Sequence, residues 1–372
     1  MGISRSERLA AEAARLIAAG VSGNVFPAAA AAISYRDASG KLQMATASGG
    51  VVVPGGKPAE DDTPFDLASL TKPIFAAATL RLVARGTTTL EAKPDQLVPD
   101  ARGTPGGAAT LEQLLTHRSG LAAWGGLYLD VPHDPGTTAA RRWIFGEACR
   151  RTDDGPPGRS VYSDLGYIVA GEAVSRASGR DLDELIAAEI LAPLALNDHH
   201  LCYAAALPAD RLGELQRKAA ATERDDWRGR LLRGEVHDEN CYALGGVSGH
   251  AGMFGTARGV ATFARAYLDA SLARGPFLPK ILTDRALALR PGGTHRLGWD
   301  VKSGPESAAG KRASMKTFGH LGFTGTSVWC DPERDLVVVL LTNRVCPSRA
   351  NEKIKGFRPA FYDGVFALFD AG

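Results

Sequence analysis

Ser69 and Lys72 are spaced so that one side chain can activate the other. Ser69 follows a strand-like run at 65–68, and Lys72 opens an apolar run at 73–84 that we expect to be helical. At the start of a helix, side chains three residues apart lie on one face, so the ammonium and the hydroxyl can share a proton. Proton sharing of this kind is one way to activate an otherwise unreactive serine. The N–H of a residue at a helix start has no intrahelical acceptor, so it can also stabilise an oxyanion.

A serine and a lysine at this spacing also occur by chance, on the order of once in a chain of this length. Two features of the context favour function. Ser69-x-x-Lys72 is the only such pair in the sequence, and it lies at a strand-to-helix junction. Pro73 fits a helix start, because N–H groups in the first turn have no intrahelical acceptor to lose.

The composition limits the class of protein. The chain has 372 residues, 45% of them hydrophobic and 23% charged, with a formal net charge of +2. This is an ordinary globular composition, and the balanced charge favours neither nucleic acid nor an anionic membrane surface as a partner. No stretch is long and apolar enough to predict a membrane span.

The cysteines and the N-terminus bear on the compartment. Five irregularly spaced cysteines without a C-x-x-C pair argue against a disulfide framework or a metal site, and they suit a reducing compartment. Glu7, Arg8, Glu12 and Arg15 interrupt the first apolar positions, so we expect no signal peptide and a cytoplasmic protein.

Strand patterns lie at both ends of the chain, and helix patterns lie between them. We expect one sheet built from both termini, with helices flanking it, a mainly helical insertion covering one edge and the site between the two parts. We predict a single domain over 1–372, with an α/β lobe at about 1–95 and 286–372 and a helical lobe at about 96–285. The expected strands are 26–35, 41–47, 65–68, 296–301, 326–331 and 336–342, and the expected helices are 110–117, 166–177, 181–191, 257–273 and 350–369.

Four motifs in order give the chain a family resemblance. They are FDLASLTK at 65–72, LLTHRSGL at 114–121, Pro157-Gly158 with YSDLGY at 162–167, and GHLGFTG at 319–325. The chain resembles the serine β-lactamase and penicillin-binding protein superfamily, and most of all its class C-like branch of β-lactamase-related serine hydrolases. That branch includes D-Ala-D-Ala carboxypeptidases, D-aminopeptidases and carboxylesterases. The resemblance implies a β-lactamase/transpeptidase-like fold and acyl-enzyme chemistry without a cofactor or a metal.

By this resemblance, Tyr162 is the residue that takes the Ser69 proton and later activates water. The family pattern is Y-x-N, and three other tyrosines followed two residues later by Asp also match it loosely; the neighbouring motif residues favour Tyr162. A phenol is a weak base unless its pKa is lowered, and we expect the Lys72 cation to lower it. The alternative is a buried structural tyrosine.

Asp164 stands where the family most often has asparagine. An amide can donate a hydrogen bond to a substrate carbonyl, whereas a carboxylate only accepts. Asp164 can pair with Lys72 and keep it charged, or accept from a substrate N–H or amine. A purely structural pairing with Lys72 stays open.

The third family motif is usually K-T-G, and here it reads His320-Leu321-Gly322. Lysine favours a carboxylate-bearing substrate, whereas histidine is only partly protonated near neutral pH, so strong binding of β-lactam carboxylates is in doubt. We expect Gly322 to let the substrate backbone lie against the strand. The N–H of Phe323 would be the second oxyanion donor beside that of Ser69.

Two further segments contain histidine residues. We expect His117 to pack and hydrogen-bond behind the site. Residues 237–240 do not predict a metal site, because four adjacent side chains rarely converge on one ion. The stretch 237–254 resembles a sub-branch linked to the recycling of cell-wall peptides.

The sequence therefore predicts a serine hydrolase that acts through an acyl-enzyme on an amide or ester, with a muropeptide as the first candidate substrate. One alternative is a carboxylesterase or weak β-lactamase with the same site. Another is a non-catalytic sensor or scaffold with this fold, although such a protein would not need Ser69, Lys72 and Tyr162.

Overall fold

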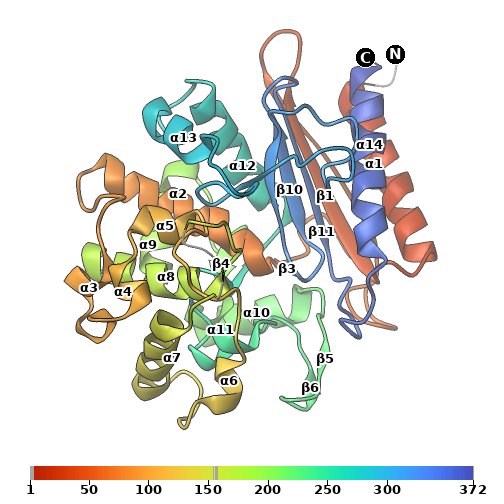
Figure 1. Cartoon of the computed structure of the whole chain (residues 1–372). Coiled ribbons are helices and arrows are strands. Elements are labelled where there is room, and N and C mark those ends of the chain that lie inside the picture. Colours follow the sequence, from red (N-terminus) through yellow and green to blue (C-terminus); the bar gives the residue numbers. More distant parts are fainter. Residues whose placement is uncertain (1–3, 154, 156–157, 372) are drawn as a thin grey trace.

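One side of the molecule is built around a six-stranded antiparallel sheet (Figure 1). The computed structural model describes residues 4–153, 155 and 158–371. The strand order is β2-β1-β11-β10-β9-β8, so strands from both chain ends meet where Ala29 in β1 lies opposite Thr342 in β11. This confirms the expected sheet built from both termini. The strands are β1 Ala28–Arg36, β2 Leu42–Gly50, β8 Asp300–Val301, β9 Phe318–Leu321, β10 Ser327–Asp331 and β11 Leu336–Thr342.

Helices cover both faces of this sheet. The terminal helices α1 (Arg5–Ser22) and α14 (Ile354–Asp370) lie side by side on one face, and α12 (Ala257–Ser271) lies against the other (Figure 1). β1 serves both layers because successive side chains point to opposite faces of a strand. Ala28, Ala30 and Ala32 belong to the core on the α12 side, whereas Ala29 and Ala31 belong to the core under α1 and α14. Small side chains let helices approach from both sides.

The remaining elements form a helical side next to the sheet (Figure 1). A small sheet in the order β3-β7-β4 lies there, made of β3 Phe65–Asp66, β7 Met253–Gly255 and β4 Leu201–Tyr203. A two-stranded ribbon joins β5 Arg224–Asp225 and β6 Arg230–Leu231. The helices are α2 Thr71–Ala84, α3 Pro94–Leu97, α4 Pro105–Ala108, α5 Leu111–Leu115, α6 Leu127–Asp130, α7 Thr138–Arg150, α8 Asp164–Ser178, α9 Leu182–Ile186, α10 Ala209–Lys218, α11 Glu239–Ala243 and α13 Lys280–Leu287.

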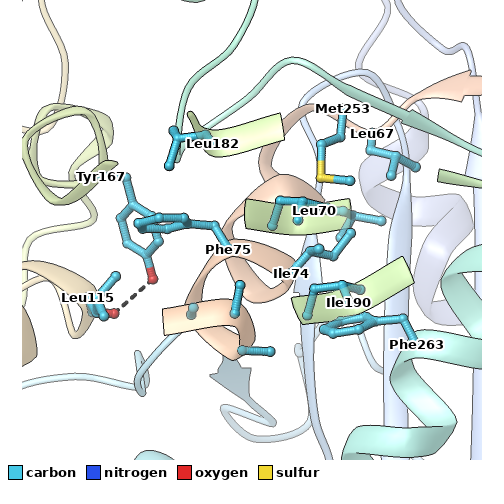
Figure 2. Close-up of a cluster of buried hydrophobic side chains, with 14 of the residues drawn as sticks. Leu67, Leu70, Ile74, Phe75, Leu115, Tyr167, Leu182, Ile190, Met253 and Phe263 are labelled. Atoms are coloured by element: carbon cyan, nitrogen blue, oxygen red, sulfur yellow. Dashed lines mark hydrogen bonds between the residues drawn. The ribbon is translucent and has the colours of Figure 1, made fainter. Parts of the chain in front are cut away.

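The helix α2 is buried on nearly every side. A helix that is apolar all round needs partners on all faces, and Figure 2 shows them around Leu70, Ile74 and Phe75. The ring of Phe75 meets that of Tyr167 edge-on, and the Tyr167 hydroxyl donates to the Leu115 carbonyl at 2.9 Å. The segment that carries Lys72 is therefore held in a packed core, which limits its movement.

Two elements differ from the expectation. The expected strand 296–301 pairs only at Asp300–Val301, because the N–H of Arg296 turns back to the carbonyl of Trp299. The expected helix 181–191 is α-helical only over Leu182–Ile186 and continues as a π-helical turn over Ala187–Leu191. The boundaries between the two lobes stay a prediction. Among the described residues, no helix is long and apolar enough to cross a membrane.

Candidate active site

Ser69 lies in a 3₁₀ turn, Ala68–Leu70, that joins β3 to α2. Ala68 has φ +46°, in the left-handed region that residues with a side chain rarely enter. The buried Asp66 fixes this backbone, since its carboxylate accepts from the N–H of Ala68 at 2.8 Å and from the N–H of His237 at 2.7 Å. The serine is thus presented on a constrained backbone, which nothing in the sequence had indicated.

Lys72 is fully buried beneath Ser69, and its ammonium group contacts three oxygen atoms. Its Nζ lies 2.9 Å from Ser69 Oγ, 2.6 Å from Asp164 Oδ1 and 3.1 Å from the His250 carbonyl oxygen. Burial alone disfavours the charged amine, but Asp164, together with Tyr162, raises the pKa of Lys72 above its ordinary value. The structure thus pairs a charged Lys72 with Asp164, the first of the arrangements that the sequence left open.

Asp164 keeps some access to solvent. Its side chain is 18% exposed and lines the cleft described below. It is the first residue of α8, where the positive end of the helix dipole favours a carboxylate. Its backbone N–H donates to the Ala123 carbonyl at 2.8 Å. The carboxylate can therefore both hold Lys72 and face a ligand.

Tyr162 lies just before α8, with its ring between three histidines. The ring centroids of His117, His295 and His320 are 4.6, 5.3 and 6.0 Å away, and Lys72 Nζ is 5.0 Å from the Tyr162 centroid. Burial raises the pKa of Tyr162, and Lys72 opposes this only in part. The expectation that Lys72 would lower the pKa of Tyr162 below its ordinary value is therefore wrong in its net direction. In the free protein the phenol is protonated and Lys72 is charged.

His117 supports this segment from behind, as expected. Its Nδ1 accepts from the N–H of Ser163 at 2.9 Å, and its carbonyl accepts from the N–H of Val161 at 2.9 Å. Burial holds the pKa of His117 well below its usual range, so the ring is neutral and Nδ1 is free to accept. His117 therefore positions residues 161–164 and does not reach the cleft itself.

His320 lies on β9 and is buried. Its Nδ1 is 2.9 Å from the Leu321 carbonyl oxygen, which can only accept, so the proton is on Nδ1 and Nε2 carries a lone pair. Burial, with help from the Lys72 charge, lowers the pKa of His320 to about 3. The ring is neutral rather than partly protonated as expected, so it supplies no charge for a carboxylate.

Gly322 and Phe323 begin the turn that joins β9 to β10. Gly322 accepts from the N–H of Gly325 at 3.1 Å and donates to the Thr326 carbonyl at 2.7 Å. Phe323 is 49% exposed at the cleft, and its N–H has no acceptor among the residues that the structure describes. The turn thus offers one free N–H donor beside Ser69.

The structure explains the glycine at position 322 by close packing within the protein, whereas the expected explanation was the approach of the substrate. A Cβ at this position would lie 2.0 Å from Thr326 Oγ1 and 2.7 Å from the Leu67 carbonyl oxygen. Contacts this short are forbidden for a real side chain, so the glycine lets the turn close onto the backbone that leads to Ser69.

These residues line one cleft of about 690 Å³. Ser69, Tyr162, Asp164, His320, Gly322 and Phe323 all reach it, and Lys72 lies beneath its floor. The cleft also has walls that were not predicted as site residues, namely Trp124, Asp238, His250, His295 and Arg349. Trp124 is 49% exposed, so it offers an aromatic surface at the cleft.

The side chains of residues 237–239 pair with three different partners. His237 pairs with Glu223 at 2.8 Å, Asp238 with His250 at 2.9 Å and Glu239 with Arg349 at 2.6 Å. Within the described part of the chain, no group of three or more His, Cys, Asp or Glu side chains is placed to hold a metal ion.

The stretch 237–254 contributes to the site through His250. The His250 ring lies 2.8 Å from Ser248 Oγ and 2.9 Å from Asp238 Oδ1, and its carbonyl accepts from Lys72. Burial would raise the pKa of Asp238, but His250 holds that pKa far below its usual range. The Asp238 carboxylate thus fixes the loop that orients Lys72. The sequence indicated this stretch but no role for any of its residues.

A comparison with protein families identifies the fold and the chemistry. The family model described as "Beta-lactamase" matches residues 13–356. The chain belongs to this family. It is a serine hydrolase with a β-lactamase and penicillin-binding-protein type of fold. Three of the four sequence motifs lie wholly in described parts of the chain, while Pro157 of the remaining motif lies outside the described residues.

Two curated relatives cover most of this hydrolase. The N-acetylmuramyl-L-alanine amidase of Bacillus subtilis is 32% identical over 314 residues, covering 76% of this chain and 68% of the relative. A putative D-alanyl-D-alanine carboxypeptidase of Escherichia coli is 29% identical over 351 residues, covering 84% of this chain and 76% of the relative.

Solved structures share the fold at lower identity. EstCE1, a hydrolase with promiscuous acyltransferase activity, matches with a TM-score of 0.72 at 17% identity, covering 96% of this chain and 99% of that one. The octameric penicillin-binding protein homologue of Pyrococcus abyssi matches with a TM-score of 0.68 at 19% identity, covering 90% of this chain and 73% of that one.

Proposed function

We propose that this hydrolase cleaves an amide bond in muropeptides, through an acyl-enzyme on Ser69. The observation that carries the proposal is the contact of Lys72 with both Ser69 (2.9 Å) and Asp164 (2.6 Å) at the floor of the cleft. The amidase and carboxypeptidase names of its relatives point to cell-wall peptides as the substrate class. Small fragments of this kind would suit the cytoplasmic recycling role expected from the sequence.

In the acylation step, Ser69 Oγ attacks the carbonyl carbon and its proton passes to the Tyr162–Lys72 pair. The same proton then goes to the leaving nitrogen as the carbon–nitrogen bond breaks. Because Tyr162 is protonated and Lys72 is charged in the free protein, the reactive form is the one in which this pair has lost one proton. Deacylation runs the same path with water in place of Ser69.

The negative charge on the carbonyl oxygen needs donors that are already in place. In this proposal the N–H groups of Ser69 and Phe323 bind it. His320 contributes a different group, because its Nε2 lone pair can accept a hydrogen bond from a substrate N–H. Asp164 serves first to hold Lys72 and next to accept from the substrate.

The charges along the cleft favour an internal amide over a C-terminal peptide bond. A carboxypeptidase must hold the free carboxylate of its substrate, and a fixed cation does this best. His320 is neutral, Arg349 is engaged by two carboxylates, and Lys355 pairs with Glu352 at 2.7 Å. Arg344 and Arg358 also line the cleft, but their guanidinium groups donate to backbone carbonyls of the protein. An amidase that separates the muramyl group from its peptide needs no such cation.

The neutral His320 also supports a second candidate, a carboxylesterase. An uncharged ester places no carboxylate in the cleft and needs only the Ser69 chemistry. By the same reasoning, β-lactams, which carry a carboxylate, would be poor substrates.

Mass spectrometry of a muropeptide mixture, incubated with the wild-type enzyme, tests the proposal. Serine-dependent release of free N-acetylmuramic acid is the expected result, and Ser69→Ala should abolish it while the protein stays folded. Loss of D-alanine instead would mean a carboxypeptidase. Unchanged muropeptides, with hydrolysis of simple esters, would favour the carboxylesterase. Full activity in Ser69→Ala would refute the mechanism.

A further inference from the structure

The orientation of the Phe323 N–H is set by the carbonyl of the preceding residue. The C=O of Gly322 and the N–H of Phe323 belong to one planar trans peptide and point in opposite directions. Any group that binds the Gly322 carbonyl on the protein side therefore directs the Phe323 N–H away from it. The N–H of Gly325 binds this carbonyl from within the turn at 3.1 Å, and a side chain from outside the turn binds it at a shorter distance.

Arg358 on α14 binds that carbonyl. Its Nη2 donates to the Gly322 carbonyl at 2.7 Å and to the Thr326 carbonyl at 2.9 Å, so one nitrogen spans the start and end of the turn. Arg358 lines the cleft but is only 8% exposed. These two backbone contacts lie at the turn that carries the candidate oxyanion donor.

Arg358 is also unusual in its charge balance. No carboxylate among the described residues forms an ion pair with it, and its Nε has no hydrogen-bond partner there. Burial lowers the pKa of Arg358 to about 10, which still leaves it charged at neutral pH. Burying a cation without a carboxylate costs free energy, and the two hydrogen bonds from Arg358 to the turn act against that cost. This points to a positioning role.

A second arginine holds the other side of Phe323. Arg344 Nε donates to the Phe323 carbonyl at 2.9 Å, and its Nη1 donates to the carbonyls of Arg349 and Asn351, each at 2.9 Å. Both peptide units that flank the Phe323 Cα are thus held by guanidinium groups from the protein side. The planar, multi-donor guanidinium suits this better than an ammonium.

We propose that Arg358 is a positioning residue that holds the Phe323 N–H in the orientation needed to bind the oxyanion. The proposal rests on the acyl-enzyme chemistry at Ser69 proposed above, but not on the identity of the natural substrate. Arg358 touches neither Ser69 nor the reacting carbonyl. It acts through the Gly322–Phe323 peptide.

A pair of simple esters separates this role from a structural one. Sulfur accepts hydrogen bonds more weakly than oxygen, so a thionoester gains less from oxyanion donors than the matching oxoester. Arg358→Met should lower kcat/KM for the oxoester by about 10²-fold, the size expected for one lost oxyanion donor, and should lower it far less for the thionoester. KM for the oxoester should change little, because the donor acts on the transition state.

Arg233 offers a matched control. Its guanidinium also donates to two backbone carbonyls, those of Ala219 (2.8 Å) and Arg217, but it does not line the cleft. Arg233→Met should leave the oxoester-to-thionoester ratio unchanged. Arg358→Lys keeps a positive charge but lacks the planar guanidinium group. We therefore expect an intermediate loss of kcat/KM for the oxoester and no comparable loss for the thionoester. Methylguanidinium should restore part of the oxoester activity of Arg358→Ala.

The outcomes separate this proposal from the proposed function. Equal losses on both esters in Arg358→Met or Arg358→Lys would overturn the positioning role, and so would a wild-type rate in Arg358→Met. In either case the acyl-enzyme mechanism would still stand, provided that Ser69→Ala is inactive. If Ser69→Ala hydrolysed both esters normally, the mechanism and the positioning role would fall together. If Arg358→Met does not fold, Arg358→Lys and the rescue of Arg358→Ala decide the question.

Discussion

At the scale of single residues, the proton balance of the site depends on a carboxylate. Asp164 lies 2.6 Å from Lys72 Nζ, so the two charges neutralise each other beneath Ser69. With Asp164 in place, the pKa of Lys72 is raised, although burial acts to lower it. An asparagine here, as in most of the family that the sequence resembles, would leave the buried lysine without this support. The aspartate thus keeps a proton on Lys72, and this proton must leave before the serine can react.

Asp164→Asn should move the pH dependence of the enzyme to lower pH. Because Asp164 raises the pKa of Lys72, its removal lowers that pKa, and the form that accepts a proton appears at lower pH. The loss of an opposite charge at this distance shifts a pKa by roughly 1–3 units, so the rising limb of kcat/KM should shift down by about that much. A pH–rate profile with a simple ester measures it.

The matched control is Asp130→Asn, which removes a carboxylate that is 60% exposed and paired with Arg151 outside the cleft. Its profile should coincide with that of the wild type. A rising limb that stays in place in Asp164→Asn would mean that Lys72 does not set the proton balance.

At the scale of elements, local patterns predicted what local interactions determine. The sequence predicts a helix at 110–117, and α5 forms there over Leu111–Leu115, with Thr110 and Gln113 in a capping box at its start. The hairpin of β10 and β11 was found from its turn residues and its apolar runs. The order of the motifs along the chain predicts Ser69, Lys72, Tyr162 and Asp164 as site residues, and the structure brings them together at one cleft.

Long-range contacts determined what the sequence did not predict. The left-handed Ala68 exists because the side chain of Asp66 and the loop at His237 hold it, and alanine carries no sign of this. His295 reaches the cleft from a loop without a regular pattern. The π-helical turn after α9 carries the buried Glu189, which meets Arg81 and Arg85 from α2. Apart from Asp66, which lies two residues from Ala68, none of these partners is near in sequence.

The packing of α12 on the sheet gives a prediction at this scale. Arg265 is 3% exposed and donates to Asp269 at 2.8 Å and to the Asp335 carbonyl at 3.0 Å, so it ties α12 to the turn between β10 and β11. Arg265→Met should lower the free energy of unfolding by about 3 kcal/mol, the lower end for breaking a buried ion pair, because Arg36 and Arg274 still face the two carboxylates. Urea unfolding measures the loss.

Activity separates this effect from damage to the site. The kcat/KM of folded Arg265→Met should equal that of the wild type, since α12 does not line the cleft. Arg176→Met, which breaks an exposed pair with Glu172, should change the unfolding free energy by less than about 0.5 kcal/mol. Similar losses in both variants would contradict the assigned role of Arg265.

At the scale of the whole molecule, the site is assembled where the sheet meets the helical side. Ser69 comes from the turn before α2 and Lys72 from α2 itself, Tyr162 and Asp164 come from the junction at the start of α8, and Phe323 comes from the turn between β9 and β10. Neither the sheet nor the helical side holds all of these residues. The sheet itself is complete only when β1 from the start of the chain pairs with β11 from its end. Topologies with so many distant contacts fold slowly, because loop closure precedes the contacts that reward it.

Two threonine hydroxyl groups join the turn that carries Phe323 to the segment that carries Ser69, next to the two proposed oxyanion donors. Thr324 Oγ1 donates to the Asp66 carbonyl at 2.7 Å, and Thr326 Oγ1 donates to the Leu67 carbonyl at 3.0 Å. Both acceptors lie within three residues of Ser69, and both donors lie within three residues of Phe323. These hydrogen bonds therefore set the spacing between the N–H of Ser69 and the N–H of Phe323.

Thr326→Val tests this linkage, since valine keeps the shape of threonine but cannot donate. The Leu67 carbonyl would keep the N–H of Leu70 but lose the Thr326 hydroxyl, so the free energy of unfolding should fall by about 0.5–1.5 kcal/mol, the net value of one hydrogen bond. Because the turn would no longer be fixed against the Ser69 segment, kcat should fall by about tenfold with KM little changed, a smaller loss than that of a whole donor. Thr262→Val, which removes an exposed bond within α12, is the control and should change neither quantity. If Thr326→Val lost stability and kept its full kcat, the two hydroxyls would only fasten the parts together, and the spacing of the donors would have to come from the arginines alone.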